Sequence, residues 1–306
     1  MIKIYYRSIK EKSLKRLEEL KKGSWIFVES PTKKELDYLS EKFSLERSLL
    51  QDAIDPYEVP RLEIHKDIVY IFTRFPCQKM TRVFTAPLLI AIAPDFILTL
   101  SMESLSFLQV FLEQRIEFYT TQKTKFLLQI FSQINQLYNR FLTEISKQVR
   151  AISVELEKIE NRDIIKFVGF EEILNDFLSA LVPTNALLNK LLSGNIIPLF
   201  APDKELIEDL FLSNEQLIEL SKSTLKNIVN IREAYSTIMT NNLNRVMKFF
   251  TTLTIILTIP MIISGFYGMN VSLPFSKSPL AFLGLVALSS VISLILLFIF
   301  MKKRWL

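Results

Sequence analysis

The chain has 306 residues, of which 49% are hydrophobic and 23% charged, and it carries a formal net charge of +5. This length suits about two domains, and the apolar excess must be concentrated in one part of the chain. Because acids are interleaved with the basic residues, and no basic block with stacking aromatics occurs, we expect no nucleic-acid partner. A single Cys77 excludes an internal disulfide, and with the single His65 it excludes a His/Cys metal cluster.

The first 103 residues resemble an α/β domain, because short β-branched and aromatic runs alternate with helical patterns. The N-terminus is charged every few residues and lacks the apolar core of a secretory signal, so we expect it to start in the cytosol. Strands are predicted at Ile2–Tyr6, Trp25–Val28, Arg61–His65, Ile68–Arg74, Pro87–Ile92 and Phe96–Leu100. The pattern predicts a small sheet flanked by helices.

Two surface helices are predicted between these strands. Residues Lys12–Lys22 are rich in helix formers and are followed by Gly23, a typical helix stop. Residues Lys33–Phe43 are preceded by Thr32, with Glu35 three positions later, which is the spacing of a capping box.

From about Leu105 the pattern is helical, with apolar residues at three- and four-residue steps. We expect a long amphipathic helix, a turn at Asn161–Gly169, a second helix at Phe170–Leu192 and a connection at Gly194–Pro202. From Asp203 no Pro or Gly interrupts the pattern until Pro260. A helix over residues 203–267 would be on the order of 95 Å long, whereas the hydrocarbon core of a bilayer is about 30 Å thick. Much of it must therefore stand outside the bilayer as a stalk.

Two runs without charge, Phe249–Ser276 and Ser278–Met301, each exceed the ~20 residues needed to span a membrane. Basic residues flank the ends joined to the N-terminal region, so both termini are expected in the cytoplasm of a cell carrying this protein in its inner membrane. The predicted division is a cytosolic α/β domain (1–103), a cytosolic long-helix region (104–202), a stalk (203–248), a first span (249–267), an extracytoplasmic loop (268–279), a second span (280–301) and a basic tail (302–306).

The first span carries a stripe of polar and small residues. Steps of seven residues give two rows, which are the a and d positions of one heptad frame: Asn244, Thr251, Thr258 and Gly265 with Met247, Thr254, Met261 and Gly268. Parallel copies in a left-handed bundle would turn such a face inward. Inward oxygens favour a hydrated pore, and the alternative is that small and hydroxyl residues only let helices approach closely.

The stripe contains no Asp or Glu. A pore built from it would hold a cation by hydroxyl and carbonyl dipoles and by the cation's own water. This suits Mg²⁺, which loses its water reluctantly, better than a transition metal that prefers His or Cys ligands. Rings of dipoles are a known basis of ion selectivity.

The tripeptide Gly268-Met269-Asn270, directly after a first span and before a short loop and second span, resembles the signature of the CorA family of magnesium channels. Segments Asn244–Lys248, Asp55-Pro56 and Pro60–Glu63 and the basic ending Lys302-Lys303-Arg304-Trp305-Leu306 strengthen the resemblance. It covers essentially the whole chain and is sharpest in the last 65 residues.

The resemblance implies a homopentamer, with a funnel of α/β domains in the cytosol, a stalk helix that continues into the pore-lining span, and an outer second span. Gly268, Met269 and Asn270 would form the outer mouth, where five Asn270 amides bind the water shell of Mg²⁺. Polar pore positions of the family match Asn244, Thr251 and Gly265. Its apolar constriction matches Met247 and Phe250.

Some positions depart from the family pattern. Thr258 and Met261 occupy positions at which the family has Met and Thr, so the two residue types are exchanged. Pro260 is displaced by one position from the family's register, and the outer loop carries Lys277 where the family often has acidic residues. Glu233 matches the stalk carboxylate of the family's cytosolic regulatory Mg²⁺ site, but no acid occurs at 76–80, where the neighbouring subunit would supply its partner.

Three other functions compete with Mg²⁺ conduction. A zinc transporter of related architecture usually has Gly-Ile-Asn at the mouth, so Met269 favours Mg²⁺, with Co²⁺ and Ni²⁺ as further substrates. A membrane-anchored scaffold without conduction would need no polar stripe. An enzyme with an organic cofactor is not expected, because the chain lacks a Walker loop, a Gly-x-Ser-x-Gly motif and a dinucleotide fingerprint.

Overall fold

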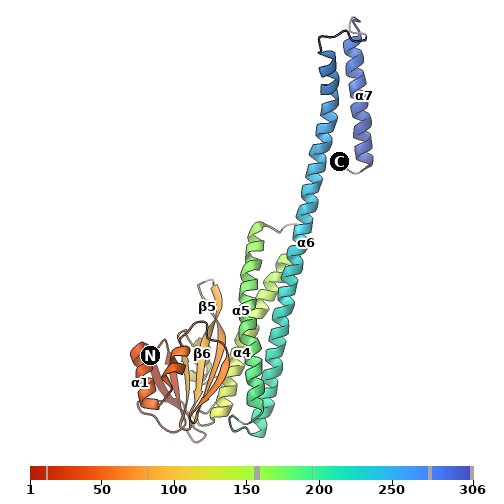
Figure 1. The fold of residues 1–306 in the computed structure, drawn as a ribbon. Helices are drawn as coiled ribbons and strands as arrows, with labels where there is room; N and C mark the ends of the chain where they lie inside the picture. The colour runs from red at the N-terminus through yellow and green to blue at the C-terminus, as the bar shows by residue number, and fades with distance from the viewer. Residues whose placement is uncertain (12, 81, 155–158, 195, 275–277, 304–306) are drawn as a thin grey trace. The chain divides into compact units, whose positions relative to one another are not determined.

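The structure is a computed structural model that describes residues 1–306 except 12, 81, 155–158, 195, 275–277 and 304–306. Its contacts divide the chain into two compact units, Met1–Asn230 and Ile231–Leu306. The first unit contains the sheet and its helices, and the second contains the helical hairpin at the C-terminus (Figure 1).

The first unit is built on one sheet, whose seven described strands lie in the order β2-β1-β3-β7-β6-β5-β4. Described neighbours in this sheet run antiparallel except β3 and β7, which pair in parallel. The strands are β1 (Ile2–Tyr6), β2 (Lys15–Leu17), β3 (Ser24–Glu29), β4 (Arg61–His65), β5 (Ile68–Lys79), β6 (Arg82–Ile92) and β7 (Phe96–Ser101). The predicted strands are confirmed, and β5 and β6 are longer than predicted because they form one extended hairpin.

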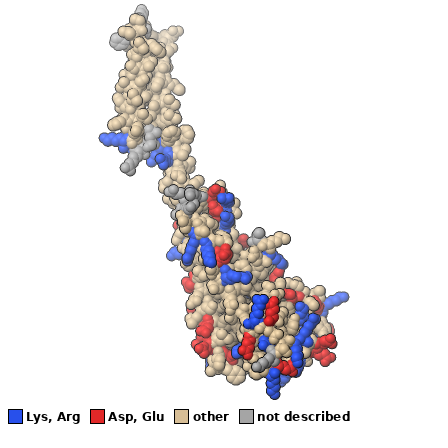
Figure 2. Space-filling view, turned by 180° about the vertical axis from the view of Figure 1, so that it is seen from behind, with Lys and Arg blue, Asp and Glu red and all other residues tan. Residues whose placement is uncertain are grey.

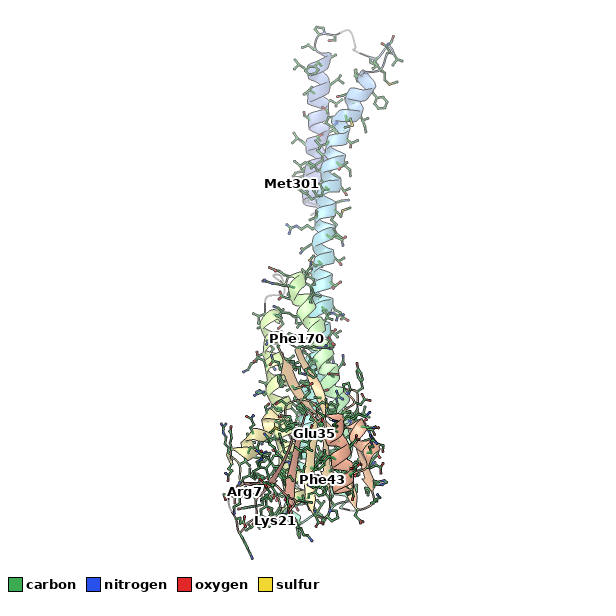
Figure 3. All side chains as sticks on the ribbon, turned by 90° about the vertical axis from the view of Figure 1, so that its left-hand side faces the viewer. Arg7, Lys21, Glu35, Phe43, Phe170 and Met301 are labelled. Carbon is green, nitrogen blue, oxygen red and sulfur yellow. The ribbon has the colours of Figure 1, made fainter. Side chains whose placement is uncertain are left out.

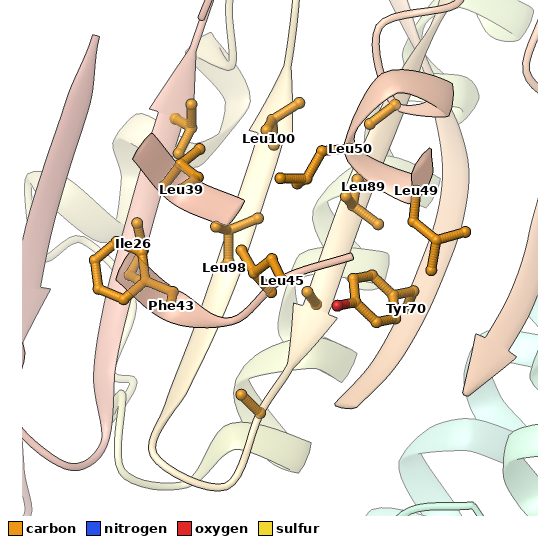
Figure 4. Packing of buried hydrophobic residues seen from close by; sticks show 14 of the residues in the cluster. Ile26, Leu39, Phe43, Leu45, Leu49, Leu50, Tyr70, Leu89, Leu98 and Leu100 are labelled. Atoms are coloured by element: carbon orange, nitrogen blue, oxygen red, sulfur yellow. The ribbon is translucent and has the colours of Figure 1, made fainter. Parts of the chain in front are cut away.

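One face of the sheet is covered by α1 (Lys33–Phe43) and α2 (Arg47–Asp52). Leu39 and Leu50 are fully buried against strand residues such as Ile26 and Leu98 (Figure 4). The predicted capping box of α1 is present, since the Glu35 backbone N–H donates to the Thr32 hydroxyl and the Glu35 carboxylate accepts from the Thr32 backbone N–H. The latter bond lowers the pKa of Glu35.

The opposite face is built from aromatic rings around Trp25, which is fully buried. The ring of Phe126, from α4 (Lys123–Ser153), lies 5.0 Å from that of Trp25, and the ring of Phe118 lies 6.2 Å away. Trp25 Nε1 also donates to the Thr99 hydroxyl at 2.9 Å. Central strands are therefore buried on both faces, which explains why β3 and β7 are near-continuous apolar runs.

The predicted helix Lys12–Lys22 is wrong, because residues Lys15–Leu17 form the edge strand β2, which pairs antiparallel with β1. Leu17 and Leu20 are partly buried and pack against the core beneath α1. Their three-residue spacing imitates a helix, but pairing with an open sheet edge satisfies the backbone and overrides helix propensity.

The predicted turn at Asn161–Gly169 is also wrong, because this segment is the start of α5 (Asn161–Leu192). Glu160 and Asp163 form a capping box that begins the helix at this point, so the polar residues are a helix N-terminus and not a loop. Lys166 donates to Asp163 at 3.0 Å and lowers the pKa of that carboxyl.

The remaining helices of the first unit are η1 (Ser106–Leu108), α3 (Gln109–Leu112) and the first part of α6 (Ala201–Tyr267). Buried polar bonds tie α4, α5 and α6 together. Asn135 donates to the Leu210 carbonyl at 3.3 Å, and Asn214 donates to the Leu181 carbonyl at 2.9 Å. The predicted uninterrupted helix from Asp203 is confirmed.

The second unit contains the rest of α6 and helix α7 (Ala281–Lys302), joined by a short loop (Figure 1). Two of the described helices, α6 and α7, contain segments long and apolar enough to cross a membrane, and only 6% and 0% of these segments are buried. A soluble core helix would be mostly buried, so this exposure favours membrane spans.

Candidate functional site

The C-terminal half of α6 has two chemically different faces. One face lies against α7, because Ser293 of α7 contacts the Ile256 carbonyl, and Thr252 one turn earlier is completely buried. At about 100° per residue, the predicted stripe lies roughly opposite this face. Most of the stripe is exposed and Thr258 is half-buried, the exposed members being Asn244, Met247, Thr251, Thr254, Met261, Gly265 and Gly268. Within this unit, α7 therefore leaves the stripe uncovered.

Two hydroxyls of the stripe have a fixed proton. Thr254 donates to the Phe250 carbonyl at 2.8 Å, and Thr258 donates to the Thr254 carbonyl at 2.7 Å, each one helical turn back. Because the proton is used by the backbone, the free lone pairs of each oxygen face outward as acceptors. Such a face suits a species that presents hydrogen-bond donors, as the water shell of a cation does.

On the N-terminal side of Thr251, two large apolar side chains stand along this face, Met247 within the stripe and Phe250 beside it. Met247 and Phe250 have 56% and 57% of their surface exposed. Basic side chains gather at this end of the hairpin, and the surface between them and the loop is without charged side chains in the view of Figure 2. The described basic residues at this end are Arg245, Lys248, Lys302 and Lys303.

Helix α6 ends at the tripeptide. Its last helical residue is Tyr267, and the Gly268 N–H donates to the Ser264 carbonyl at 2.9 Å. A Cβ on residue 268 would lie 3.3 Å from that carbonyl oxygen, so glycine lets the chain turn closely over the helix end. Met269 and Asn270 follow outside the helix and are exposed. Side chains project freely around the hairpin in Figure 3, where Met301 marks the opposite end of α7.

The predicted regulatory residue Glu233 lies on α6 and is exposed. Among the residues that the structure describes, no group of three His, Cys, Asp or Glu side chains could hold a metal ion. Burial raises the pKa of the Cys77 thiol to about 12, so this side chain stays a neutral thiol at physiological pH. One chain therefore does not assemble a resident metal site from described residues.

The upstream segments Asp55-Pro56 and Pro60–Glu63 both make contacts within the first unit, and Arg74 donates to the Pro56 carbonyl at 2.9 Å. The guanidinium of Arg61 lies 2.7 Å from Asp52 and 2.6 Å from Glu63, also pairs with Glu58, and stacks over the Phe72 ring. These contacts fix the start of β4 against the sheet.

Ser293, which contacts α6 from the second span, was not among the residues predicted from the sequence. The sequence feature that could have indicated Ser293 is the presence of Pro260 in one span and a hydroxyl residue in the other. A proline frees a backbone carbonyl, and a hydroxyl of a neighbouring helix can donate to it. Two predicted features, Lys277 of the outer loop and the end of the tail at 304–306, lie outside the described residues.

A family model described as CorA-like Mg²⁺ transporter protein matches residues 21–304. A curated relative, the cobalt/magnesium transport protein CorA of Methanocaldococcus jannaschii, is 28% identical over 289 residues, which cover 92% of this chain and 90% of the relative. The family match includes strands β3 to β7 and both helices of the hairpin.

The complete structure of the CorA magnesium transporter from Methanocaldococcus jannaschii superposes with a TM-score of 0.89 at 25% identity, covering 100% of this chain and 99% of the other. The cytoplasmic domain of ZntB from Vibrio parahaemolyticus gives a TM-score of 0.65 at 10% identity, covering 78% of this chain and 98% of the other. The second likeness shows a shared fold only. With the family match spanning nearly its whole length, the chain belongs to the CorA-like Mg²⁺ transporter family, a class of transporters and not of enzymes.

Proposed function

We propose that the protein is a magnesium channel of the cell membrane that conducts hydrated Mg²⁺ through a homopentamer. The observation that carries the proposal is the polar stripe of α6, which lies opposite the α7 contact and ends at Gly268-Met269-Asn270. Each chain supplies one such stripe, so several copies around an axis would enclose a pore with α7 outside. Family membership supports the same arrangement.

The stripe fits hydrated Mg²⁺ chemically. The waters bound to Mg²⁺ donate hydrogen bonds, and Thr254 and Thr258 present oxygens whose own protons already bond the helix backbone. Asn270 adds an amide oxygen at the mouth. Because Mg²⁺ gives up its waters reluctantly, a ring of acceptors can pass the ion without stripping its shell. Co²⁺ and Ni²⁺ are proposed as further substrates, since they form similar hydrated ions.

The gate is proposed at Met247 and Phe250. Five copies of these large apolar side chains would close the pore by steric contact or by expelling water. The basic end of the hairpin faces the cytoplasm in this proposal, with both termini on that side. The outer loop would then carry the Asn270 mouth on the opposite side of the bilayer.

The proposal is tested by replacing one hydroxyl with a methyl group. Thr254→Val keeps the shape of the side chain but removes an acceptor from every subunit. One hydrogen bond contributes about 0.5–1.5 kcal/mol, a factor of about two to twelve, and five are lost together, so Mg²⁺ uptake into proteoliposomes is expected to fall at least about threefold. Uptake is measured with a Mg²⁺-sensitive dye inside the vesicles.

Thr252→Val is the matched control, because Thr252 lies on the α7 face and its hydroxyl has no hydrogen-bond partner among the described residues. It should leave uptake within about twofold of wild type. Equal losses for the two variants would contradict a pore along the stripe. Transport of Zn²⁺ without Mg²⁺ would favour the zinc alternative, and no transport of either ion would favour a scaffold.

Regulation by cytosolic Mg²⁺ is a further proposal and rests on Glu233. Its carboxylate is exposed on α6, so a second chain could complete a site. Isothermal titration of the full-length protein should show millimolar Mg²⁺ binding that Glu233→Gln weakens severalfold, whereas Glu219→Gln, an exposed glutamate on the same helix, should not. Identical titrations for all three proteins would contradict this role.

A further inference from the structure

Pro260 interrupts the hydrogen bonding of α6 inside the apolar segment. In an α-helix, the backbone N–H of residue 260 would donate to the carbonyl of residue 256, four positions back. Proline has no N–H, so the Ile256 carbonyl loses this partner. In hydrocarbon no water replaces it, and an unsatisfied backbone group there is costly.

A side chain from the other helix reaches this carbonyl. The Ser293 hydroxyl of α7 donates to the Ile256 oxygen at 3.4 Å across the helix pair. Ser293 is half-buried on the α7 face that lies against α6. A neighbouring serine of α7 does not make such an interhelical bond. Buried Ser289, one turn earlier, donates instead to the Val286 carbonyl of its own helix.

We propose that Ser293 is a positioning residue for the pore stripe, acting by bonding the Ile256 carbonyl that Pro260 leaves free. Pro260 stands between Thr258 and Met261, so it divides the stripe into a lower and an upper part. Without the bond, the helix can bend or unwind at this point and the upper part loses its alignment. This inference rests on the proposed channel function, while the hydrogen bond itself does not.

The test is a double-mutant cycle on the full-length protein in detergent and in proteoliposomes. Interhelical hydrogen bonds in membranes contribute modestly, so Ser293→Ala should lower the apparent midpoint of thermal unfolding by about 2 °C and Mg²⁺ uptake by about threefold. Ser293→Thr keeps the hydroxyl and should restore both values. Ser289→Ala is the matched control and should change neither.

Pro260→Ala provides the decisive background, because alanine restores the N–H that bonds Ile256. In that background Ser293→Ala should have no further effect on the unfolding midpoint or on uptake. An equal effect of Ser293→Ala with and without Pro260 would overturn the inference, and so would equal effects of Ser293→Ala and Ser289→Ala. If wild type transports no Mg²⁺, the channel proposal fails, and the unfolding cycle still decides whether Ser293 bonds Ile256.

Discussion

Asn270→Ala is expected to abolish rescue of a Mg²⁺-transport-deficient bacterium that wild-type protein rescues. The substitution removes one amide per chain from the proposed mouth and leaves the end of α6 intact, because Gly268 makes the closing turn. A hydrogen bond to a charged species contributes about 1.5–3 kcal/mol, and five are lost together in a pentamer. Uptake should therefore fall at least about tenfold. Rescue is measured as growth in low-Mg²⁺ medium, and transport is measured as Mg²⁺ uptake into proteoliposomes.

Asn242→Ala is the matched control, since Asn242 is an exposed amide of the same chain that lies on α6 outside the stripe. It should rescue growth as wild type does, provided that membrane fractions contain equal amounts of each protein. Equal growth with Asn270→Ala and wild type would remove the mouth assignment. Absence of rescue by wild type would remove the Mg²⁺ function itself.

Trp25→Ala should be the most damaging single change to the first unit. It removes the largest fully buried side chain, whose ring contacts Phe126 at 5.0 Å and whose Nε1 bonds Thr99. Replacing a buried Trp or Phe by Ala costs about 3–5 kcal/mol, and Thr99 is left buried without this partner. The free energy of unfolding should fall by that amount, measured by denaturant titration of the full-length protein in detergent.

Two controls separate packing from hydrogen bonding at this position. Trp25→Phe keeps a ring but leaves Thr99 without its donor, so it should cost less than Trp25→Ala. Tyr57→Ala, at a side chain that is 87% exposed, should change the free energy of unfolding by less than about 0.5 kcal/mol. A cost for Trp25→Ala no larger than that of Tyr57→Ala would contradict the central place of Trp25 in the core.

The proposed pore works without a fixed negative charge, because no Asp or Glu occurs from 249 to 301. Selectivity would then come from the number and direction of acceptors facing a hydrated ion. The backbone bonds of Thr254 and Thr258 set that direction, since each proton is turned away from the stripe. This arrangement favours an ion that keeps its water over one that seeks direct ligands.

Much of the fold was predictable from local sequence. The capping box at Thr32 and Glu35, the alternating strand runs and the uncharged segments are read from neighbouring residues, so their positions were predicted correctly. The stripe was predictable for the same reason, because a seven-residue repeat fixes which side chains share one face of a helix. The failures occurred where local patterns were ambiguous, as in Lys12–Lys22 and Asn161–Gly169.

The sequence by itself determined the hairpin, its polar stripe and the tripeptide that follows α6, because these depend on spacing along one helix. Only the tertiary structure decided that Lys15–Leu17 joins the sheet, since strand pairing depends on a distant partner with a free edge. Likewise, the structure decided that Thr252 lies on the α7 face of α6, whereas the hydroxyls of Thr254 and Thr258 bond the backbone of their own helix. Ser293 and Ile256 are 37 positions apart, and only their folded proximity shows that one completes the bonding of the other.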